Sequence, residues 1–108
     1  MHVVFGTDEF HKNCKQMLSL QQQRELRRIF RSVGANPWIG DGLRTVWFRE
    51  VRMRDKRLYY VIEASAVLFV AVSNKRTQQE VIDKHRLLLE EYRILLRELI
   101  RSGGRGLL

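Results

Sequence analysis

The sequence predicts an α+β domain with an N-terminal strand and helical hairpin, an antiparallel β-meander and a long C-terminal helix. Three observations support this prediction: helical spacing of apolar residues in the first third of the chain, strand-like segments in the middle, and a long helical pattern at the end. The expected element order is β-α-α-β-β-β-α. The 108 residues fit one domain. We assign it to residues 1–101 and expect the glycine-rich residues 102–108 to form a flexible tail.

The N-terminal third is expected to form one strand followed by a helical hairpin. His2–Gly6 has the apolar character of a short strand, and Thr7 is a suitable N-cap for a first helix. Ser19, with Gln22 three residues later, has the spacing of a capping box that opens a second helix, and Gly34 is expected to end that helix. The apolar positions at helical spacing are Phe10, Cys14, Met17 and Leu18 in the first helix and Leu26, Ile29, Phe30 and Val33 in the second.

The middle of the chain is expected to form a three-stranded antiparallel meander. A loop rich in proline and glycine covers Asn36–Gly42. The strand candidates that follow are Leu43–Met53, Arg57–Glu63 and Val67–Ser73. The links between them are short enough for hairpins. The last of these strands is apolar on both faces, which predicts a central place in the sheet.

The C-terminal pattern predicts one long helix that ends near Arg101. Thr77 and Glu80 have the spacing of a capping box at its start. The apolar positions are Val81, His85, Leu88, Tyr92, Leu95 and Leu99 on one stripe and Ile82, Leu89 and Leu96 on a second, with Leu87 and Ile94 nearby. This arc is wider than one packed face needs, so part of it is expected to bind a partner protein. The alternative is a helix that its own domain buries on two sides.

The chain is strongly basic and rich in arginine. The 20 lysines and arginines outnumber the 12 acidic residues and give a net charge of +8. A guanidinium group can bind phosphate through two hydrogen bonds and can stack on bases, so this composition indicates a nucleic-acid partner. The alternative is a general preference for arginine at solvated positions. No apolar run is long enough to span a bilayer and no export signal is recognisable, so we expect a cytoplasmic protein without membrane contact.

Few of the residue groups that commonly carry catalysis are present. The single cysteine, Cys14, excludes an intrachain disulfide and a cysteine-based zinc site, and its helical spacing indicates a core position. His2, His11 and His85 are too widely separated to indicate a metal site. No glycine-rich phosphate loop follows a strand. We therefore expect neither a metal nor another cofactor.

Basic residues concentrate instead on the predicted sheet. They are Arg49, Arg52, Arg54, Lys56 and Arg57, with Lys75 and Arg76 at the end of the last strand. Strand alternation places Phe48, Glu50 and Arg52 on one face. If the register brings the strand ends together, Arg52, Arg57 and Arg76 line one cleft, in which Phe48 offers a stacking surface. Such a cleft would bind a phosphate and stabilise the charge that develops when a phosphodiester is attacked. A solvated basic face is the alternative.

Several of these segments resemble the RelE/ParE toxin superfamily. The similar segments are Glu50–Arg52, Arg57–Glu63, Val67–Arg76 and Gln79–Val81, together with Asn36-Pro37 at the end of the helical hairpin. The resemblance covers about Val3 to Tyr92. The expected element order also agrees with the family's small sheet, which is flanked by an N-terminal hairpin and a C-terminal helix.

The resemblance implies the toxin of a prokaryotic type II toxin–antitoxin pair, neutralised by an antitoxin protein. In the RelE branch, the toxin enters the ribosomal A site and cleaves mRNA. The family's conserved arginines match Arg57 and Arg76, with Lys75 beside the latter. By this resemblance Arg57 would stabilise the developing charge of the phosphate, and Arg76 would assist there or protonate the leaving oxygen.

The resemblance and the basic sheet together define the candidate site and the expected partners. The candidate catalytic residues are Arg57, Arg76 and Arg52, and the candidate RNA-binding residues are Lys75, Lys56, Arg54, Arg49 and Phe48. The expected partners are the ribosome, mRNA and an antitoxin with an acidic, amphipathic segment that covers the basic cleft and the apolar arc of the last helix.

The chain departs from the RelE pattern at three positions. Two lysines of the best-known RelE enzymes correspond to Phe48 and Glu50, and their C-terminal-helix tyrosine falls at Ile82. No general base is therefore evident. Glu50 or His85 could take that role, provided for Glu50 that neighbouring arginines offset its charge. These departures keep two alternatives open: a ParE-like inhibitor of DNA gyrase, and a basic RNA-binding module that has lost toxicity.

Overall fold

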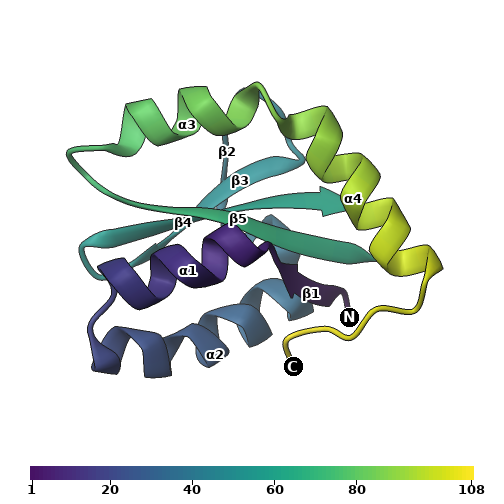
Figure 1. The fold of residues 1–108 in the computed structure, drawn as a ribbon, viewed down its shortest axis with the longest axis horizontal. Helices are drawn as coiled ribbons and strands as arrows, with labels where there is room; N and C mark the ends of the chain where they lie inside the picture. The colour runs from purple at the N-terminus through teal and green to yellow at the C-terminus, as the bar shows by residue number, and fades with distance from the viewer.

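A computed structural model describes residues 1–108 and has an α+β fold in which four α-helices flank a five-stranded mixed sheet (Figure 1). The elements are β1 (Val3–Gly6), α1 (Asp8–Met17), α2 (Leu20–Ala35), a short 3-10 helix (Pro37–Ile39), β2 (Asp41–Gly42), β3 (Phe48–Met53), β4 (Lys56–Glu63), β5 (Ala66–Asn74), α3 (Gln78–Arg86) and α4 (Leu89–Arg101). The predicted fold class and the meander of β3, β4 and β5 are confirmed, whereas the elements differ in detail from the predicted order.

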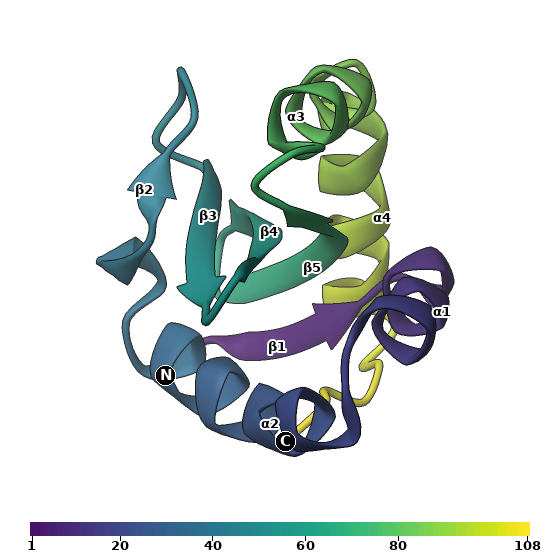
Figure 2. The ribbon, with the colours of Figure 1, turned by 90° about the vertical axis from the view of Figure 1, so that its left-hand side faces the viewer.

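The sheet has the strand order β1-β5-β4-β3-β2, which Figure 2 shows from β1 at the bottom to β2 at the upper left. Strand β1 pairs with β5 in parallel, and the remaining neighbours are antiparallel. Strand β5 therefore lies between β1 and β4, which confirms the central place predicted from its apolar character. Its two faces are both buried because helices cover the sheet on both sides.

The sheet separates two hydrophobic cores. Helices α1 and α2 pack on one face, and α3 and α4 pack on the other (Figure 1). The first core includes Phe10, Cys14, Ile29, Phe30, Leu58, Tyr60 and Phe69, and the second includes Phe48, Tyr59, Leu68, Ile82, Leu89 and Leu96. Cys14 is buried in the first core, as predicted, and this burial raises the pKa of its thiol to about 12. Successive residues of a strand thus face different helix pairs.

The predicted starts of the first two helices are confirmed by their capping hydrogen bonds. The Phe10 amide donates to Thr7 Oγ1 at 3.0 Å at the start of α1. At the start of α2, the Gln22 amide donates to Ser19 Oγ at 3.1 Å, and the Ser19 amide donates to Gln22 Oε1 at 3.0 Å. Both directions of the capping box are therefore present.

Gly34 does not end the second helix, because α2 continues to Ala35. A Cβ atom at Gly34 would lie 3.1 Å from Val4 Cγ2 and 3.2 Å from the His2 carbonyl oxygen. The His2 amide also donates to the Gly34 carbonyl at 2.8 Å. The glycine therefore allows β1 to pack closely against α2, and the chain leaves the helix at Asn36 instead.

The first strand of the meander is shorter than predicted. The sequence predicts a strand over Leu43–Met53, but β3 begins at Phe48. The two-residue strand β2 pairs with β3 as a hairpin, and residues 43–47 form the loop between them. The Leu43 amide donates to the Phe48 carbonyl at 2.8 Å and closes that hairpin. Arg44 has a φ of 66°, a left-handed conformation that interrupts the extended backbone.

The predicted C-terminal helix is divided into α3 and α4 at Leu87 and Leu88. The predicted capping box is also absent, because the Thr77 amide and hydroxyl both donate to Asn74 Oδ1, at 2.9 and 3.1 Å. Neither helix is long and apolar enough to cross a membrane, and nor is any other helix of the structure.

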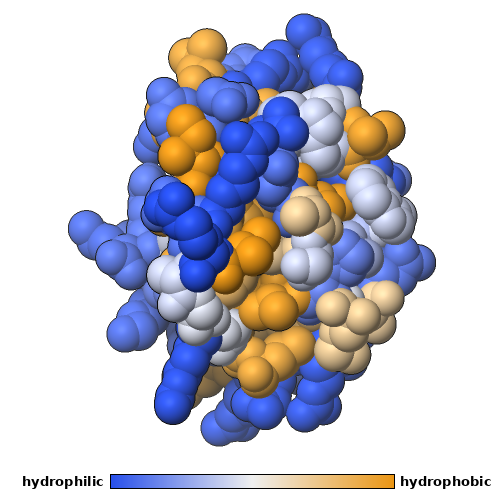
Figure 3. Space-filling view, turned by 90° about the vertical axis from the view of Figure 1, so that its right-hand side faces the viewer, coloured by the Kyte–Doolittle hydropathy of each residue, from blue (hydrophilic) through white to orange (hydrophobic).

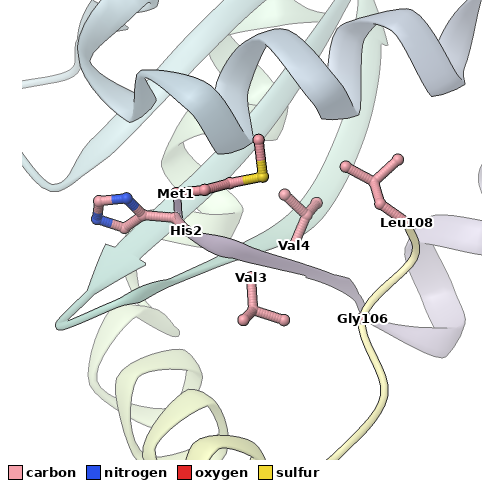
Figure 4. A pocket seen from close by; sticks show the side chains of 6 residues that line it. All are labelled: Met1, His2, Val3, Val4, Gly106 and Leu108. Atoms are coloured by element: carbon pink, nitrogen blue, oxygen red, sulfur yellow. The ribbon is translucent and has the colours of Figure 1, made fainter.

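Residues 102–108, predicted to be a flexible tail, lie along the outer edge of β1 in the structure. The Gly104 amide donates to the Leu99 carbonyl at 2.9 Å, and the Leu107 amide donates to the Val4 carbonyl at 2.7 Å. Leu107 is partly buried against the core beneath α1 and α2. The two ends of the chain enclose a mainly apolar hollow of about 250 Å³, whose lining residues are labelled in Figure 4.

Candidate functional site

Two arginines face each other on neighbouring strands. Arg52 on β3 pairs directly with Arg57 on β4, and Arg57 pairs in turn with Ser73 on β5. Side chains at directly opposed positions lie on the same face of a sheet. This is the face covered by α3 and α4, because Tyr59, two residues after Arg57, packs in one core with Ile82. The register that the cleft hypothesis requires of Arg52 and Arg57 is therefore present.

Lys75 and Arg76 lie in the turn between β5 and α3, shortly after Ser73. Both are exposed, as is Arg52. In the antiparallel meander, the end of β3, the start of β4 and the end of β5 fall at the same end of the sheet. We call this the basic end of the sheet, defined by Arg52, Arg57, Lys75 and Arg76.

Arg57 differs from the other three because its charge is buried. The residue is 6% exposed, and its Nε atom is buried without a hydrogen-bond partner. The nearest carboxylate oxygen, Glu50 Oε1, is 3.9 Å from Nε, which is longer than the roughly 2.7–3.2 Å of a normal hydrogen bond. A buried guanidinium that lacks an acceptor is unfavourable. The site is therefore suited to a ligand that brings acceptor oxygens, such as a phosphate.

Other polar side chains surround Arg57 on the same face. Gln78 Nε2, at the start of α3, donates to both Glu50 oxygens at 3.3 and 3.2 Å. The Tyr59 hydroxyl and Ser73 Oγ share a hydrogen bond of 2.8 Å. Burial raises the pKa of Tyr59, and the hydrogen bond to Ser73 acts in the opposite direction. We call Glu50, Arg57, Tyr59, Ser73 and Gln78 the Arg57 cluster.

Three members of this cluster were missed by sequence reasoning. The strand register could have indicated two of them. Ser73 on β5 pairs directly with Arg57, and Tyr59 follows Arg57 by two residues on β4. Gln78 has no such signal, because its contact with Glu50 depends on how α3 packs over the sheet.

Phe48 is not available to stack on a base. Its side chain is fully buried, with its ring centroid 6.3 Å from that of Tyr59. It lies on the same face as Arg52, as predicted, but helices cover that part of the strand. Ile82, at the position of the family's tyrosine, is also buried in this core.

Arg49 is held by the backbone of the β2 hairpin region and not at the basic end. Its Nε donates to the Gly40 carbonyl at 3.0 Å, and its terminal nitrogens donate to the Val46 and Trp38 carbonyls at 2.9 and 3.1 Å. Its guanidinium carbon also lies 5.6 Å from the centroid of the Trp38 ring. These contacts give Arg49 a structural role in fixing the loop before β3.

Arg54 and Lys56 lie at the β3–β4 turn and are paired with acidic residues. Arg54 forms hydrogen bonds with both carboxylate oxygens of Glu25 on α2, the closest at 2.7 Å. Lys56 Nζ donates to Asp55 Oδ2 at 2.8 Å. Both cations therefore form short ion pairs with neighbouring carboxylates, whereas Arg57 Nε lies 3.9 Å from its nearest carboxylate oxygen.

Of the two general-base candidates, the structure brings Glu50 to Arg57 and packs His85 elsewhere. His85 is buried on α3, and its Nδ1 atom is 2.6 Å from the Tyr92 hydroxyl. Burial lowers the pKa of His85, and burial raises the pKa of Tyr92 to about 12. His85 also lines a hollow of about 320 Å³ between α1 and α3, together with Glu9 and Lys84.

The apolar arc of the C-terminal helices is partly covered by the domain itself. Ile82, Leu89 and Leu96 are buried against the sheet, whereas Leu87, Ile94 and Leu95 are exposed. On the face that includes α4, apolar side chains are interspersed with charged ones (Figure 3). The domain therefore buries one part of the arc itself, and the binding of a partner protein by the exposed part stays a prediction.

None of the four surface hollows is lined by the residues of the basic end. No three histidine, cysteine, aspartate or glutamate side chains lie close enough together to hold a metal ion. In comparisons with known proteins, no family model and no curated sequence matches this chain.

Proposed function

We propose that the protein is a toxin of the RelE type that binds mRNA on the ribosome and cleaves it without a metal. The observation that supports this most is the buried Arg57 guanidinium, whose Nε lacks an acceptor and which is paired in register with Arg52. Exposed Lys75 and Arg76 continue the positive charge at the same end of the sheet. A phosphodiester would supply the missing acceptor and be held by several cations.

The proposed reaction is attack of the RNA 2′-hydroxyl on the adjacent phosphate. A P–O bond to the 2′ oxygen forms, and the P–O bond to the 5′ oxygen of the next nucleotide breaks. Water takes the proton of the 2′-hydroxyl, and water also protonates the leaving 5′ oxygen. Negative charge builds up on the phosphate oxygens during this step. Arg57 would stabilise that charge, and a group held in place before the reaction does so most effectively. Arg76 would assist through its charge, because an arginine stays protonated and is a poor proton donor.

A second candidate is a ParE-like inhibitor of DNA gyrase that catalyses no reaction. The burial of Phe48 and Ile82 favours it, because these apolar residues occupy the positions of a lysine and the tyrosine of RelE enzymes. In both candidates the proposed cellular partner is an antitoxin, whose acidic segment would cover the basic end and the exposed residues Leu87, Ile94 and Leu95. We propose that the protein acts in the cytoplasm.

The test is to add the purified protein to ribosomes programmed with a defined mRNA and to map new 5′ ends by primer extension. We expect cleavage that depends on ribosomes and falls at least about a hundredfold in Arg57→Gln and Arg76→Ala, the loss typical of removing one transition-state donor. Arg31→Ala is the matched control, since Arg31 is exposed on α2 beyond the opposite face of the sheet.

Intact mRNA in the presence of folded, ribosome-bound protein would exclude the endonuclease proposal. The gyrase candidate is then tested by a DNA supercoiling assay with the same preparations. Inhibition by the parent protein, with no change in mRNA, would favour that candidate.

A further inference from the structure

Arg57 and Glu50 form an ion pair that is buried but not closed. Their side chains are 8% and 10% exposed, and Arg57 Nε and Glu50 Oε1 are 3.9 Å apart. A closed pair would bring these atoms within about 2.9 Å. The carboxylate therefore compensates the arginine's charge without satisfying the Nε–H group.

Neighbouring side chains keep the pair open. Gln78 Nε2 donates to both oxygens of Glu50, at 3.3 and 3.2 Å, from the first turn of α3. The remaining nearby hydroxyls, of Tyr59 and Ser73, are bonded to each other at 2.8 Å. No side chain of the cluster forms a hydrogen bond with Arg57 Nε.

We infer that Glu50 is a resident anion that sets the phosphate affinity of this site, and that Gln78 positions it. This inference rests on the proposed function, in which Arg57 binds a phosphodiester. A phosphate at Arg57 would gain the unmet Nε–H donor but would be repelled by the Glu50 carboxylate. Since Gln78 holds the carboxylate away from Nε, the arginine stays free to bind.

This arrangement favours an extended strand over a single phosphate. An isolated phosphate meets both Arg57 and the repulsion of Glu50. A polynucleotide carries neighbouring phosphates that reach the exposed cations Arg52, Lys75 and Arg76, which offset that repulsion. The site should therefore favour a single strand of several nucleotides, such as the mRNA of the proposed function, and bind free phosphate and mononucleotides weakly.

The experiment follows the Arg Nε–Hε resonances of the full-length protein by NMR while inorganic phosphate is added at low salt. We compare the parent with Glu50→Gln, which removes the charge and keeps the shape, and with Gln78→Met, which removes the donor. Glu91→Gln is the matched control, because Glu91 is exposed on α4 and its loss changes the net charge equally. Binding of a labelled single-stranded RNA by fluorescence anisotropy is measured in parallel.

We expect Glu50→Gln to bind phosphate about tenfold more tightly, as a carboxylate within several ångströms of the ligand predicts after screening. Gln78→Met should bind it more weakly, because the released carboxylate can close on Arg57. Glu91→Gln should change affinity less than twofold, and the gain should vanish in Glu50→Gln/Arg57→Gln. The parent should also prefer RNA to phosphate by a larger factor than Glu50→Gln does.

Unchanged or weaker phosphate binding in a folded Glu50→Gln protein would overturn the inference, as would the absence of phosphate binding in every variant. A merely structural role for Gln78 would lower thermal stability without lowering phosphate affinity, and this result would also count against it. Failure of the proposed function gives a different result. If only the proposed function is wrong, phosphate binding follows the expected order of variants but ribosome-bound mRNA remains intact.

Discussion

Two charged side chains on β4, Arg57 and Glu63, differ in whether their hydrogen bonds are complete. Glu63 Oε2 accepts from Arg93 Nε at 2.8 Å, and Oε1 accepts from Arg97 Nε at 3.0 Å. Arg93 also lies over the Trp47 ring at 4.4 Å. Both carboxylate oxygens of Glu63 thus accept hydrogen bonds from α4, whereas Arg57 Nε is a buried donor without a partner. This contrast between the two ends of one strand supports a ligand-binding role for Arg57.

The Glu63 contact predicts a pH dependence of stability. Burial acts to raise the pKa of Glu63, but the hydrogen bonds from Arg93 and Arg97 outweigh it and hold the pKa below its ordinary value. A lowered pKa gives stability that is present above the unfolded-state pKa and is lost as pH falls through the folded-state pKa. We expect Glu63→Gln to lower the free energy of urea unfolding by about 1–2 kcal/mol at pH 7. The difference should shrink near pH 3, whereas Glu91→Gln should show none at either pH.

For single residues, the sequence predicts which side chains lie beside each other better than it predicts which of them are exposed to solvent. Alternation and a short link are enough to bring Arg52 beside Arg57. The same alternation places Phe48 on that face, but how far the helices extend over the face is set by packing, and Phe48 is buried. The backbone contacts of Arg49 arise from the β2 hairpin, which the sequence does not predict.

At the scale of elements, the two hairpins of the meander share a conformational feature. Each turn has two residues between paired strand ends, and the first has a positive φ: 57° at Arg54 and 51° at Ala64. Glycine is preferred where a two-residue hairpin turn requires a positive φ, because a Cβ makes this conformation unfavourable. Both turns therefore form against local preference, and strand pairing must stabilise them.

Ala64 offers a direct test of this point. Replacing it with glycine should raise the free energy of unfolding by about 0.5 kcal/mol, since relief of the left-handed conformation exceeds the entropy cost of glycine. Ala66→Gly, two residues later in the buried and extended β5, should lower it by about 1 kcal/mol. Chemical unfolding followed by circular dichroism measures both. A destabilised Ala64→Gly protein would contradict the argument.

The caps of the first two helices follow from local signals and were predicted correctly, whereas the role of Gly34 and the break in the C-terminal helix depend on distant contacts and were not. Thr7 and Ser19 cap their helices with bonds inside one turn. By contrast, Gly34 is explained by the approach of β1, and the break at Leu87 accompanies the packing of two helices over one sheet. Neither contact leaves a periodic pattern in the sequence.

At the scale of the whole molecule, the chain has a net charge of +8, and two separate surfaces each carry four basic residues. One is the basic end of the sheet. The other is the outer side of α2, where the exposed arginines are Arg24, Arg27, Arg28 and Arg31. The sheet lies between α2 and the face that carries Arg57. A single RNA strand bound at Arg57 would therefore use the first surface and not the second.

Salt dependence distinguishes the two surfaces. If a single-stranded RNA contacts the four cations of the basic end, the logarithm of its binding constant should fall against the logarithm of salt concentration with a slope of about −3. Lys75→Ala/Arg76→Ala should reduce the slope to about half. Arg27→Ala/Arg31→Ala should leave it unchanged, and a reduced slope in that variant would place the RNA on α2 instead. Anisotropy titrations at several salt concentrations give these slopes.

The parallel pairing of β1 with β5 governs the order in which the chain can assemble during synthesis. Val3–Gly6 is among the first segments to be made, but its partner Ala66–Phe69 is made after both helices of the hairpin and most of the meander. Until then the apolar stripes of α1 and α2 have no complete sheet to cover. Strands β4 and β5, joined by two residues, can pair as soon as both are available. The N-terminal strand is thus synthesised early but joins the sheet late. The segment around Leu107, which forms a hydrogen bond with the outer edge of β1, is synthesised last and can pair with β1 only afterwards.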